Sequence, residues 1–298
     1  MGYLNPFALG NPRTVHNLAI FRQRLVELGY TEGQTLTIEY RGAEGTADRL
    51  SSLAAELVSL RVDVIVVAGP VALKAAARKV TGSVPIVALD LESDPVADGF
   101  ASSLARPGGN VTGIFLDQPE LGGKWLELLK AIVPTLSRVA VLWDPSTPSH
   151  QMRAVEEASK VLGVKLQRLP IRDSGDFEAA YAAGEKGRAQ GLVILTSPLM
   201  PRNAGRLAEL AAAKRMPTIS SFRELAMAGC LLTYGPNQDE NWRRVAGFVV
   251  RILKGAKPAD LPVERPERFE LVINMKTAKA LGLTIPQSLL NRADQVIQ

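Results

Sequence analysis

The chain has 298 residues, of which 46% are hydrophobic and 22% charged, with a formal net charge of +5. This composition suits a globular protein, and the length favours two domains over one. Basic residues are interspersed with acidic ones and aromatic residues make up only 5%, so the sequence argues against nucleic-acid binding. The lone cysteine, Cys230, excludes an intramolecular disulfide, and the two histidines, His16 and His150, lack metal-ligand spacing. We therefore expect no metal and no cofactor.

The sequence contains no apolar run long enough to span a bilayer. It opens Met1-Gly2-Tyr3-Leu4, without the basic start and apolar stretch of a secretory signal. Two expectations remain open from these features: a cytoplasmic protein, or a mature form whose leader has been removed.

Strand and helix patterns alternate along the first 90 residues, which is typical of an α/β fold with parallel sheets. Helices are predicted where leucines recur at helical spacing, and strands where apolar residues alternate or form a short continuous run. In chain order, the patterns predict a strand at 3–4, a helix over 18–28, a strand over 36–40, a helix over 50–60, a strand over 64–67, a helix over 72–80 and a strand over 85–89.

The second half repeats this plan. Its patterns predict a strand over 138–143, a helix ending at Gly163, a strand over 164–168, a helix from an Asp176 N-cap through Tyr181, a strand over 192–195, and a last helix over 236–254. The strand–helix–strand–helix order from 64 to 99 matches that from 192 to 229, which indicates a duplicated βαβ unit. Two such open sheets imply two Rossmann-like lobes, whose ligands bind outside the carboxyl ends of the strands.

The crossings between the lobes set the expected domain boundaries. Residues 1–116 and 237–265 are expected in lobe one, and residues 117–236 and 266–298 in lobe two. Crossover hinge segments are expected at 116–120, 234–237 and 262–269, where the last is rich in proline. We expect the ligand cleft between the two lobes.

The sequence lacks the usual catalytic signatures: G-x-S-x-G, the phosphate-binding G-x-x-x-x-G-K-[ST] and H-E-x-x-H. Gly108-Gly109 predicts a tight turn before a strand over 111–115, because no helix follows to hold an anion. We therefore expect a binding protein rather than an enzyme.

The candidate ligand-binding residues lie in loops that follow predicted strands. Small, polar and aromatic side chains there offer hydrogen bonds and flat apolar surfaces, and the starts of helices offer free N–H groups. The candidates are Asn5, Phe7, Pro70, Val71, Asp90, Glu92 and Ser93 in lobe one, Asp144, Ser146, Ser197, Pro198 and Phe222 in lobe two, and Tyr234 and Asn237 at the crossing.

Several of these positions have structural alternatives. Asp94 and Asp144, each followed by proline, fit helix N-caps with Pro at the first helical position. Phe7 and Phe222 fit core residues as well as ligand contacts. Asp90 and Glu92 flank one residue of an apparently extended segment, so both are expected to face the same side. Recognition of a cation or hydroxyl groups then fits the two carboxylates better than acid–base work on a glycoside.

Five stretches carry a family resemblance: FRQRLVELGYTEGQTLTIEYRGAEG (Phe21–Gly45), SLARPGGNVTG (Ser103–Gly113), KWLELLKAIVPTLSRVAVLWDP (Lys124–Pro145), LTYGPN (Leu232–Asn237) and ILKGAKPADLPVERPERFELVINMKTAKALGLTIPQSLLNRAD (Ile252–Asp294). Across essentially its whole length, the chain resembles the ABC-transporter substrate-binding protein family that includes tryptophan- and tyrosine-binding members. The resemblance implies a type I periplasmic-binding-protein fold with three crossovers. It also implies an exported protein, periplasmic or extracellular and lipid-anchored, that serves an ABC permease in the membrane.

Two departures from the family pattern fall on expected cleft loops. Gly69-Pro70-Val71 stands where many relatives carry a Thr- or Ala-rich turn, and Asp90-Leu91-Glu92-Ser93 stands where relatives often have a Gly-rich segment. We expect a monomeric importer component that binds a small aromatic or amino-acid-like carboxylate, while the identity of the ligand stays open. The alternatives are a ligand-sensing module that delivers to a receptor or regulator, and an enzyme.

Overall fold

The computed structural model of the chain describes residues 1–79, 84–116, 120–147 and 149–298. Backbone contacts divide the chain into two compact units. Unit 1 contains Met1–Asp117 and Asn237–Glu267, and unit 2 contains Gln118–Pro236 and Arg268–Gln298. The backbone therefore passes three times from one unit to the other.

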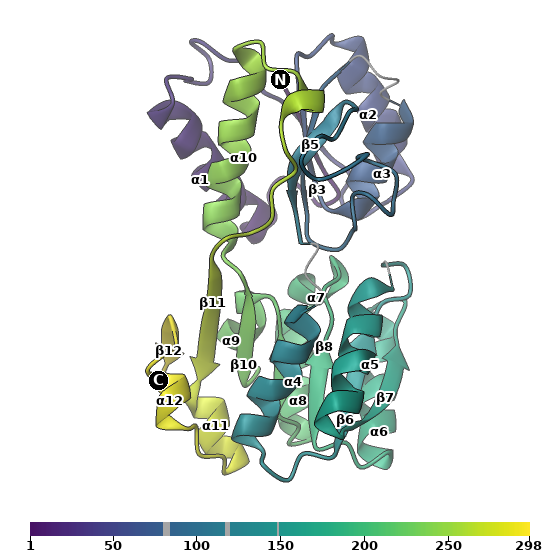
Figure 1. The fold of residues 1–298 in the computed structure, drawn as a ribbon, viewed down its shortest axis with the longest axis vertical. Helices are drawn as coiled ribbons and strands as arrows, with labels where there is room; N and C mark the ends of the chain where they lie inside the picture. Colours follow the sequence, from purple (N-terminus) through teal and green to yellow (C-terminus); the bar gives the residue numbers. More distant parts are fainter. Residues whose placement is uncertain (80–83, 117–119, 148) are drawn as a thin grey trace. The chain divides into compact units, whose positions relative to one another are not determined.

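Unit 1 is built on a five-stranded parallel sheet of order β2-β1-β3-β4-β5 (Figure 1). The strands are β1 (Gly2–Asn5), β2 (Glu39–Gly42), β3 (Ile65–Ala68), β4 (Ile86–Asp90) and β5 (Val111–Phe115). The helices are α1 (Pro12–Glu27), α2 (Arg49–Ser59), α3 (Pro70–Lys79) and α10 (Gln238–Leu253), followed by the short 3-10 helix Pro258–Asp260. Because α1 packs on α10 and α2 packs on α3, one helix pair covers each face of the sheet (Figure 1).

The core of unit 1 follows from its apolar strands and one aromatic cluster. Strands β3 and β4 lie in the middle of the sheet, and their continuous apolar runs are buried on both faces. Tyr3 of β1, Phe21 of α1 and Trp242 of α10 pack with ring centroids 6.0–6.4 Å apart. This cluster fixes α1 and α10 against the sheet.

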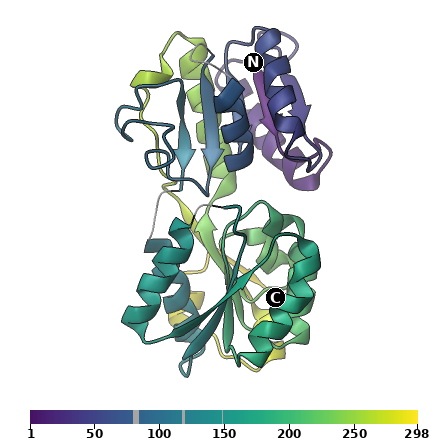
Figure 2. The same cartoon turned by 90° about the vertical axis from the view of Figure 1, so that its right-hand side faces the viewer.

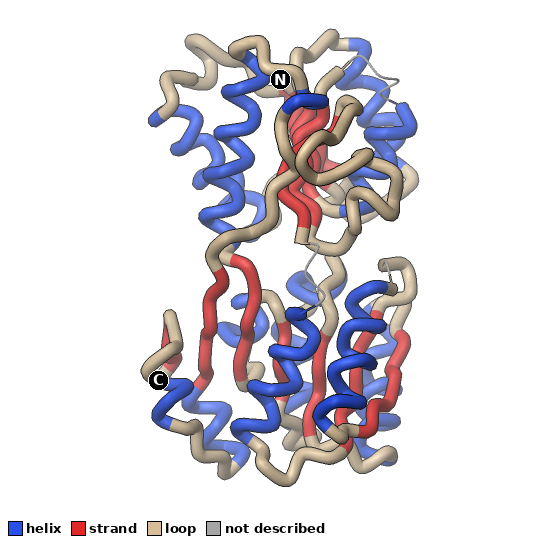
Figure 3. The backbone as a smooth tube through the Cα atoms, in the orientation of Figure 1, coloured by secondary structure: helices blue, strands red, loops and turns tan. Residues whose placement is uncertain are grey.

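Unit 2 contains a seven-stranded sheet of order β12-β11-β10-β9-β8-β6-β7, and its helices lie on both faces (Figures 2 and 3). The strands are β6 (Arg138–Trp143), β7 (Lys165–Pro170), β8 (Gly191–Ile194), β9 (Thr218–Ser220), β10 (Leu232–Pro236), β11 (Phe269–Asn274) and β12 (Gln295–Ile297). The helices are α4 (Glu120–Ile132), α5 (His150–Leu162), α6 (Phe177–Lys186), α7 (Leu199–Arg202), α8 (Ala204–Ala213), α9 (Arg223–Ala228), α11 (Met275–Leu281) and α12 (Gln287–Leu290), with the 3-10 helix Ser174–Asp176 before α6.

The prediction of parallel sheets is confirmed for unit 1 but is incomplete for unit 2. There β11 pairs antiparallel with β10, and Tyr234 lies opposite Leu271. Both strands adjoin crossings, because β10 ends where the chain enters unit 1 and β11 begins just after the chain returns. A strand that leaves the sheet and a strand that comes back run in opposite directions without needing a crossover helix.

Some predicted boundaries are wrong. The strand predicted over 36–40 begins only at Glu39, since residues 31–36 form a turn closed by the Leu36 N–H to Thr31 carbonyl bond. The last helix starts at Gln238 rather than 236, because Pro236 ends β10 and Asn237 caps the helix. Asp176 precedes α6 but does not cap it with its side chain, which accepts the Arg172 N–H at 2.7 Å. The end of the helix predicted over 72–80 and the middle of the crossing at 116–120 lie outside the described residues.

Strands β4 and β5 approach so closely at one point that only glycine fits. Gly113 has φ +134, and a Cβ there would lie 2.1 Å from the Ala88 carbonyl oxygen. We predict that Gly113→Ala lowers the free energy of unfolding by about 3 kcal/mol or more, since it combines backbone strain with a backbone clash. The measurement is denaturant-induced unfolding followed by circular dichroism.

Gly247→Ala is the matched control in the same unit, because no atom lies within 4 Å of a Cβ built on this α10 residue. It should leave stability unchanged or raise it by up to about 1 kcal/mol, the helix preference of alanine over glycine. Equal unfolding midpoints for the two variants would contradict the close approach of β4 and β5.

Candidate ligand-binding site

The chain leaves β4 through a turn made by an aspartate side chain. Asp90 is the last residue of β4, and its Oδ1 accepts the N–H of Glu92 at 3.0 Å and of Ser93 at 3.1 Å. Its backbone carbonyl accepts the Leu116 N–H at 3.1 Å, next to β5. The expectation of an extended segment from 90 to 92 is therefore wrong, because aspartate readily closes such a turn onto its own backbone. The turn nevertheless keeps Asp90 and Glu92 side by side.

Burial controls the charge of this carboxyl pair. Asp90 is 0% exposed and Glu92 4%. Burial raises the pKa of Glu92 well above its ordinary value, the neighbouring Asp90 carboxylate raises it further, and the positive charge of Arg13 on α1 offsets part of the rise. Burial also raises the pKa of Asp90, against which the Ser93 side chain and the backbone N–H groups act. Glu92 therefore stays protonated to a higher pH than an exposed glutamate does.

The pair also has unused hydrogen-bonding capacity. Asp90 Oδ2 and Ser93 Oγ are fully buried and have no hydrogen-bond partner among the described residues. The Ser93 hydroxyl lies close enough to influence the pKa of Asp90, but not in the geometry of a hydrogen bond, and the Glu92 carboxyl group is close enough to donate to Asp90 when it is protonated. Buried polar atoms without a partner are rare in folded proteins, so each one calls for an explanation.

The other predicted residues of unit 1 frame this turn or support its backbone. Asn5 ends β1, donates from Nδ2 to the Tyr3 hydroxyl at 3.0 Å and accepts the N–H of half-buried Phe7 at 2.8 Å. Pro70 is buried and starts α3 directly after β3, whereas Val71 is 38% exposed. Asn237 caps α10, with its Oδ1 accepting the Glu240 N–H at 2.9 Å.

Sequence reasoning missed three buried polar residues on the helices of unit 1. Thr14 Oγ1 on α1, and Asn241 Nδ2 and Trp242 Nε1 on α10, have no hydrogen-bond partner within the described part of the chain. All three belong to the first two turns of their helices, where His16 and Asp239 connect α1 to α10 at 2.8 Å. The sequence signal that could have found them is a polar group on the apolar stripe of an amphipathic helix.

Unit 2 has a corresponding aspartate after β6, but its carboxylate is fully used. Asp144 Oδ1 accepts the N–H of Ser146 at 2.9 Å and its hydroxyl at 2.6 Å. Asp144 Oδ2 accepts the Ser197 hydroxyl at 2.6 Å, and Ser197 Oγ accepts the Leu199 N–H at 3.1 Å. These bonds tie the end of β6 to the end of β8 and place Pro198 just before α7.

The N-cap interpretation of the two Asp-Pro pairs is wrong. Asp94 Oδ1 accepts the N–H of Val96 at 2.9 Å and of Ala97 at 3.0 Å, but the following residues form turns and no helix. After Asp144, the next helix begins only at His150. In both places the aspartate stabilises a turn, the same role that Asp90 has at β4.

An aromatic platform lies at the carboxyl end of β10. The half-buried Tyr234 ring stacks on Phe269 of β11, with centroids 5.8 Å apart and planes 27° apart. The Tyr234 carbonyl accepts the indole N–H of Trp125 on α4 at 2.7 Å, which fixes the backbone beneath the ring. Phe222, the other predicted aromatic contact in unit 2, is 3% exposed at the start of α9.

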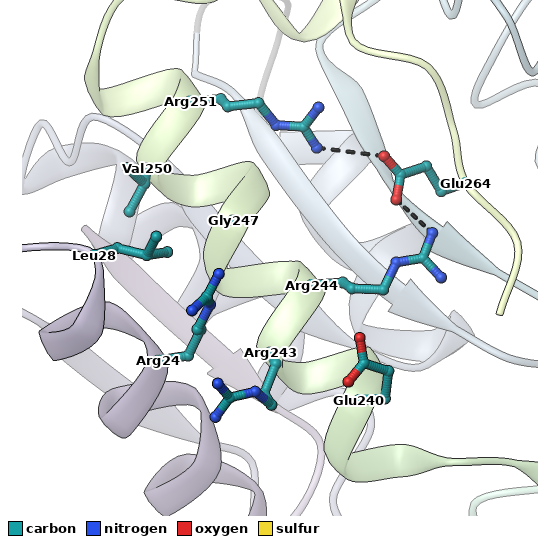
Figure 4. Close-up of a pocket in the computed structure, with 9 residues that line it drawn as sticks. All are labelled: Arg24, Leu28, Glu240, Arg243, Arg244, Gly247, Val250, Arg251 and Glu264. Carbon is teal, nitrogen blue, oxygen red and sulfur yellow. Dashed lines mark hydrogen bonds and ion pairs between the residues drawn. The ribbon is translucent and has the colours of Figure 1, made fainter. Parts of the chain in front are cut away.

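A separate groove of about 480 Å³ lies on unit 1 along α1 and α10 and contains none of the predicted site residues (Figure 4). Its arginines are neutralised by glutamates. Arg243 and Arg24 bind Glu27, whose pKa they lower, and Arg244 and Arg251 bind Glu264 (Figure 4). Exposed ion pairs of this kind contribute little to stability or binding, so the groove is a weak candidate site.

The described residues offer neither a metal site nor a membrane-spanning helix. No group of three or more His, Cys, Asp or Glu side chains is placed to hold a metal ion. None of the helices in this part of the chain combines the length and hydropathy needed to cross a bilayer.

The raised pKa of Glu92 makes stability depend on pH. Below about 4.5, the ordinary value, Glu92 is protonated in both folded and unfolded states. As pH rises, only the unfolded state ionises readily, so the contribution of Glu92 to stability is lost as pH approaches its raised folded-state pKa. We predict that Glu92→Gln, which cannot ionise, becomes progressively more stable than the wild type as pH rises from 4.5, by about 1.4 kcal/mol per unit of pKa shift.

Thermal unfolding at a series of pH values measures this difference. Asp98→Asn is the control, because it removes an exposed carboxylate from the same loop. Its stability should follow the wild type at every pH. A constant difference between Glu92→Gln and the wild type across the series would show that Glu92 ionises normally.

Comparison with known proteins places the chain in a family. A model of the ABC transporter substrate binding proteins matches residues 15–297. A tyrosine-binding protein of Clostridioides difficile (strain R20291) is 26% identical over 266 residues, which cover 88% of this chain and 75% of that protein.

Solved structures match over nearly the full length. An ABC domain from Streptococcus pneumoniae in complex with L-Trp has a TM-score of 0.89 at 24% identity, with 99% of this chain and 98% of that chain covered. A conserved domain protein from Vibrio cholerae has a TM-score of 0.88 at the same identity and coverage. The fold is that of the type I periplasmic binding proteins. Since the family model spans nearly all of it, the chain belongs to the ABC transporter substrate-binding protein family.

Proposed function

We propose that the protein is the extracytoplasmic substrate-binding component of an ABC importer. It binds a small organic ligand, releases it unchanged and delivers it to a permease in the membrane. Family membership supports the transport role, and the family acts outside the cytoplasm. In this proposal the protein works as a monomer, without a cofactor, and performs no chemistry on the ligand.

The observation that carries the proposal is the gathering of rigid polar and aromatic groups at the carboxyl ends of parallel strands. In unit 1 the acidic turn after β4 holds Asp90, Glu92 and Ser93, and in unit 2 β10 holds the Tyr234 ring just beyond its pairing with β9. Ligands of open α/β sheets bind at this edge. Both units contribute to one cleft in this proposal, and closure of the two lobes on the ligand completes the site.

The ligand proposed is an aromatic or amino-acid-like carboxylate. The relative from Clostridioides difficile is described as tyrosine-binding, and the domain from Streptococcus pneumoniae was solved with L-Trp. A flat ring suits the stacked platform of Tyr234 on Phe269, since aromatic faces bury large apolar areas with defined geometry. The polar groups of the strand-end turns are then available for the head of the ligand.

A thermal-shift screen against aromatic acids, amino acids and related small molecules tests this proposal. A ligand that binds only the folded state stabilises it by about 2.7 kcal/mol at a hundred times its Kd, so binders raise the melting temperature. We expect stabilisation by at least one aromatic amino acid or aromatic carboxylate. If stabilisation comes only from unrelated compounds such as sugars, the proposed ligand class is wrong.

An experiment in cells distinguishes a role in transport from a role in sensing. Deletion of the gene should abolish uptake of the isotope-labelled ligand if the protein serves an importer. Uptake that is normal, together with a lost transcriptional or chemotactic response to the ligand, would favour the alternative of a sensing module.

The platform at β10 gives a direct prediction for ligand affinity. Tyr234→Ala should weaken binding of L-tyrosine or L-tryptophan at least tenfold, which corresponds to about 1.4 kcal/mol, because it removes the ring that covers the ligand. Isothermal titration calorimetry measures the affinity.

Tyr234→Phe is the matched control, since it keeps the ring and its stacking on Phe269. It should retain the affinity within about threefold, about 0.7 kcal/mol. Unchanged affinity in Tyr234→Ala, with the melting temperature of the free protein also unchanged, removes Tyr234 from the site.

A further inference from the structure

The turn after β4 has features of a subsite for a positively charged group. It combines two adjacent buried carboxyl groups with an unpartnered carboxylate oxygen, Asp90 Oδ2, and an unpartnered hydroxyl, Ser93 Oγ. We propose that Asp90, Glu92 and Ser93 form a subsite of unit 1 that carries one negative charge and takes the ammonium group of an amine or amino acid. This inference rests on the proposed function, that the protein binds a small organic ligand, and adds the charge of the ligand head.

The turns made by Asp90 and Asp144 differ in how the second carboxylate oxygen is used. Both aspartates end a parallel strand and use Oδ1 to accept the N–H two residues ahead. The second oxygen of Asp144 is satisfied by the Ser197 hydroxyl, so that carboxylate is complete without a ligand. The second oxygen of Asp90 is also buried and lacks a hydroxyl or N–H donor within the described residues, and the Asp90 carboxylate interacts with the carboxyl group of Glu92 instead. The turn in unit 2 is thus structural, whereas the turn in unit 1 retains an acceptor.

Asp90 and Glu92 together carry a single negative charge in this proposal. A buried carboxylate without compensation is costly, and two adjacent carboxylates cannot both ionise cheaply. Protonation is favoured at Glu92, because burial and the neighbouring Asp90 both raise its pKa. Asp90 keeps the charge, because two backbone N–H groups donate to it.

The charge of the subsite determines which ligand group it can take. One remaining negative charge on two adjacent carboxyl groups repels a carboxylate and matches a single ammonium, which donates three hydrogen bonds. The Ser93 hydroxyl supplies a second acceptor beside Asp90. Charge-assisted hydrogen bonds of this type contribute about 1.5–3 kcal/mol each, equivalent to roughly ten- to a hundredfold in affinity.

Three probes with the same phenol ring separate the charges of the head. L-tyrosine carries ammonium and carboxylate, tyramine carries the ammonium alone, and 3-(4-hydroxyphenyl)propionate carries the carboxylate alone. Titration calorimetry with the full chain should show that L-tyrosine and tyramine bind and that the propionate binds at least tenfold more weakly than L-tyrosine.

Two isosteric variants then assign the roles within the pair. Asp90→Asn keeps an oxygen to accept the N–H groups of the turn but loses the charge, so tyramine binding should fall at least tenfold. Glu92→Gln imitates the protonated side chain, so it should lose clearly less tyramine affinity than Asp90→Asn does. Asp98→Asn, an exposed carboxylate of the same loop, should not change binding. The melting temperature of each free variant is measured alongside to show that it folds.

Each outcome decides the proposal. Equal losses in Asp90→Asn and Glu92→Gln would show two charges and overturn the single-charge pair. Unchanged tyramine binding in Asp90→Asn would overturn the subsite, as would propionate binding as tightly as L-tyrosine. In this last case the proposed binding of an aromatic carboxylate stands and only the cation subsite fails. If neither amine binds, the cation subsite is overturned, and if none of the three probes binds, the proposed aromatic ligand class is contradicted as well.

Discussion

A single interaction shapes the carboxyl edge of both sheets: an aspartate at the end of a buried parallel strand folds its carboxylate onto the backbone ahead of it. Asp90 does this after β4 and Asp144 after β6, each accepting the N–H two residues on. A parallel strand that leaves the sheet must satisfy its backbone groups before the next element begins. The aspartate does so within three residues, and the side chains that follow are thereby held at fixed positions on the carboxyl edge.

The two turns diverge in what happens to the second carboxylate oxygen. In unit 2 it accepts the Ser197 hydroxyl, so β6 and β8 are joined and the carboxylate is neutralised by three donor groups. In unit 1 the corresponding oxygen makes no hydrogen bond to an N–H or hydroxyl group of the described residues, and a second carboxyl group, Glu92, lies beside it. Burial makes this arrangement unfavourable in the free protein unless a proton is retained, and it becomes favourable when a cation arrives. In the proposed subsite, the turn after β4 gives up stability for recognition of a cation, whereas the turn after β6 keeps its stability.

Sequence patterns predicted the elements that local chemistry determines. The continuous apolar runs at β3 and β8 and the glycine stop of α5 at Gly163, which adopts φ 66, are direct consequences of burial and backbone sterics. The predicted strands over 85–89 and 138–143 placed Asp90 and Asp144 correctly at strand ends. The antiparallel β11 was beyond reach, because its pairing with β10 depends on where the chain returns from the other unit.

The site was only partly predictable for a similar reason. Alternation along a strand does not reveal where the strand ends, so Asp90 and Glu92 were expected on an extended segment that is a turn. The Asp-Pro pairs fitted helix caps because a cap and an isolated turn use the same side-chain oxygen, and only the residues beyond decide between them. Thr14 and Asn241 belong to helices whose apolar spacing is clear, and nothing local marks their side chains as lacking partners.

Carboxyl carbon-13 NMR of Asp90 and Glu92 across pH, with and without tyramine, tests the central claim most directly. The account predicts that in the free protein Asp90 is ionised and Glu92 protonated at neutral pH, and that tyramine shifts both resonances. Two carboxyl groups that titrate at ordinary values and do not respond to tyramine would contradict it.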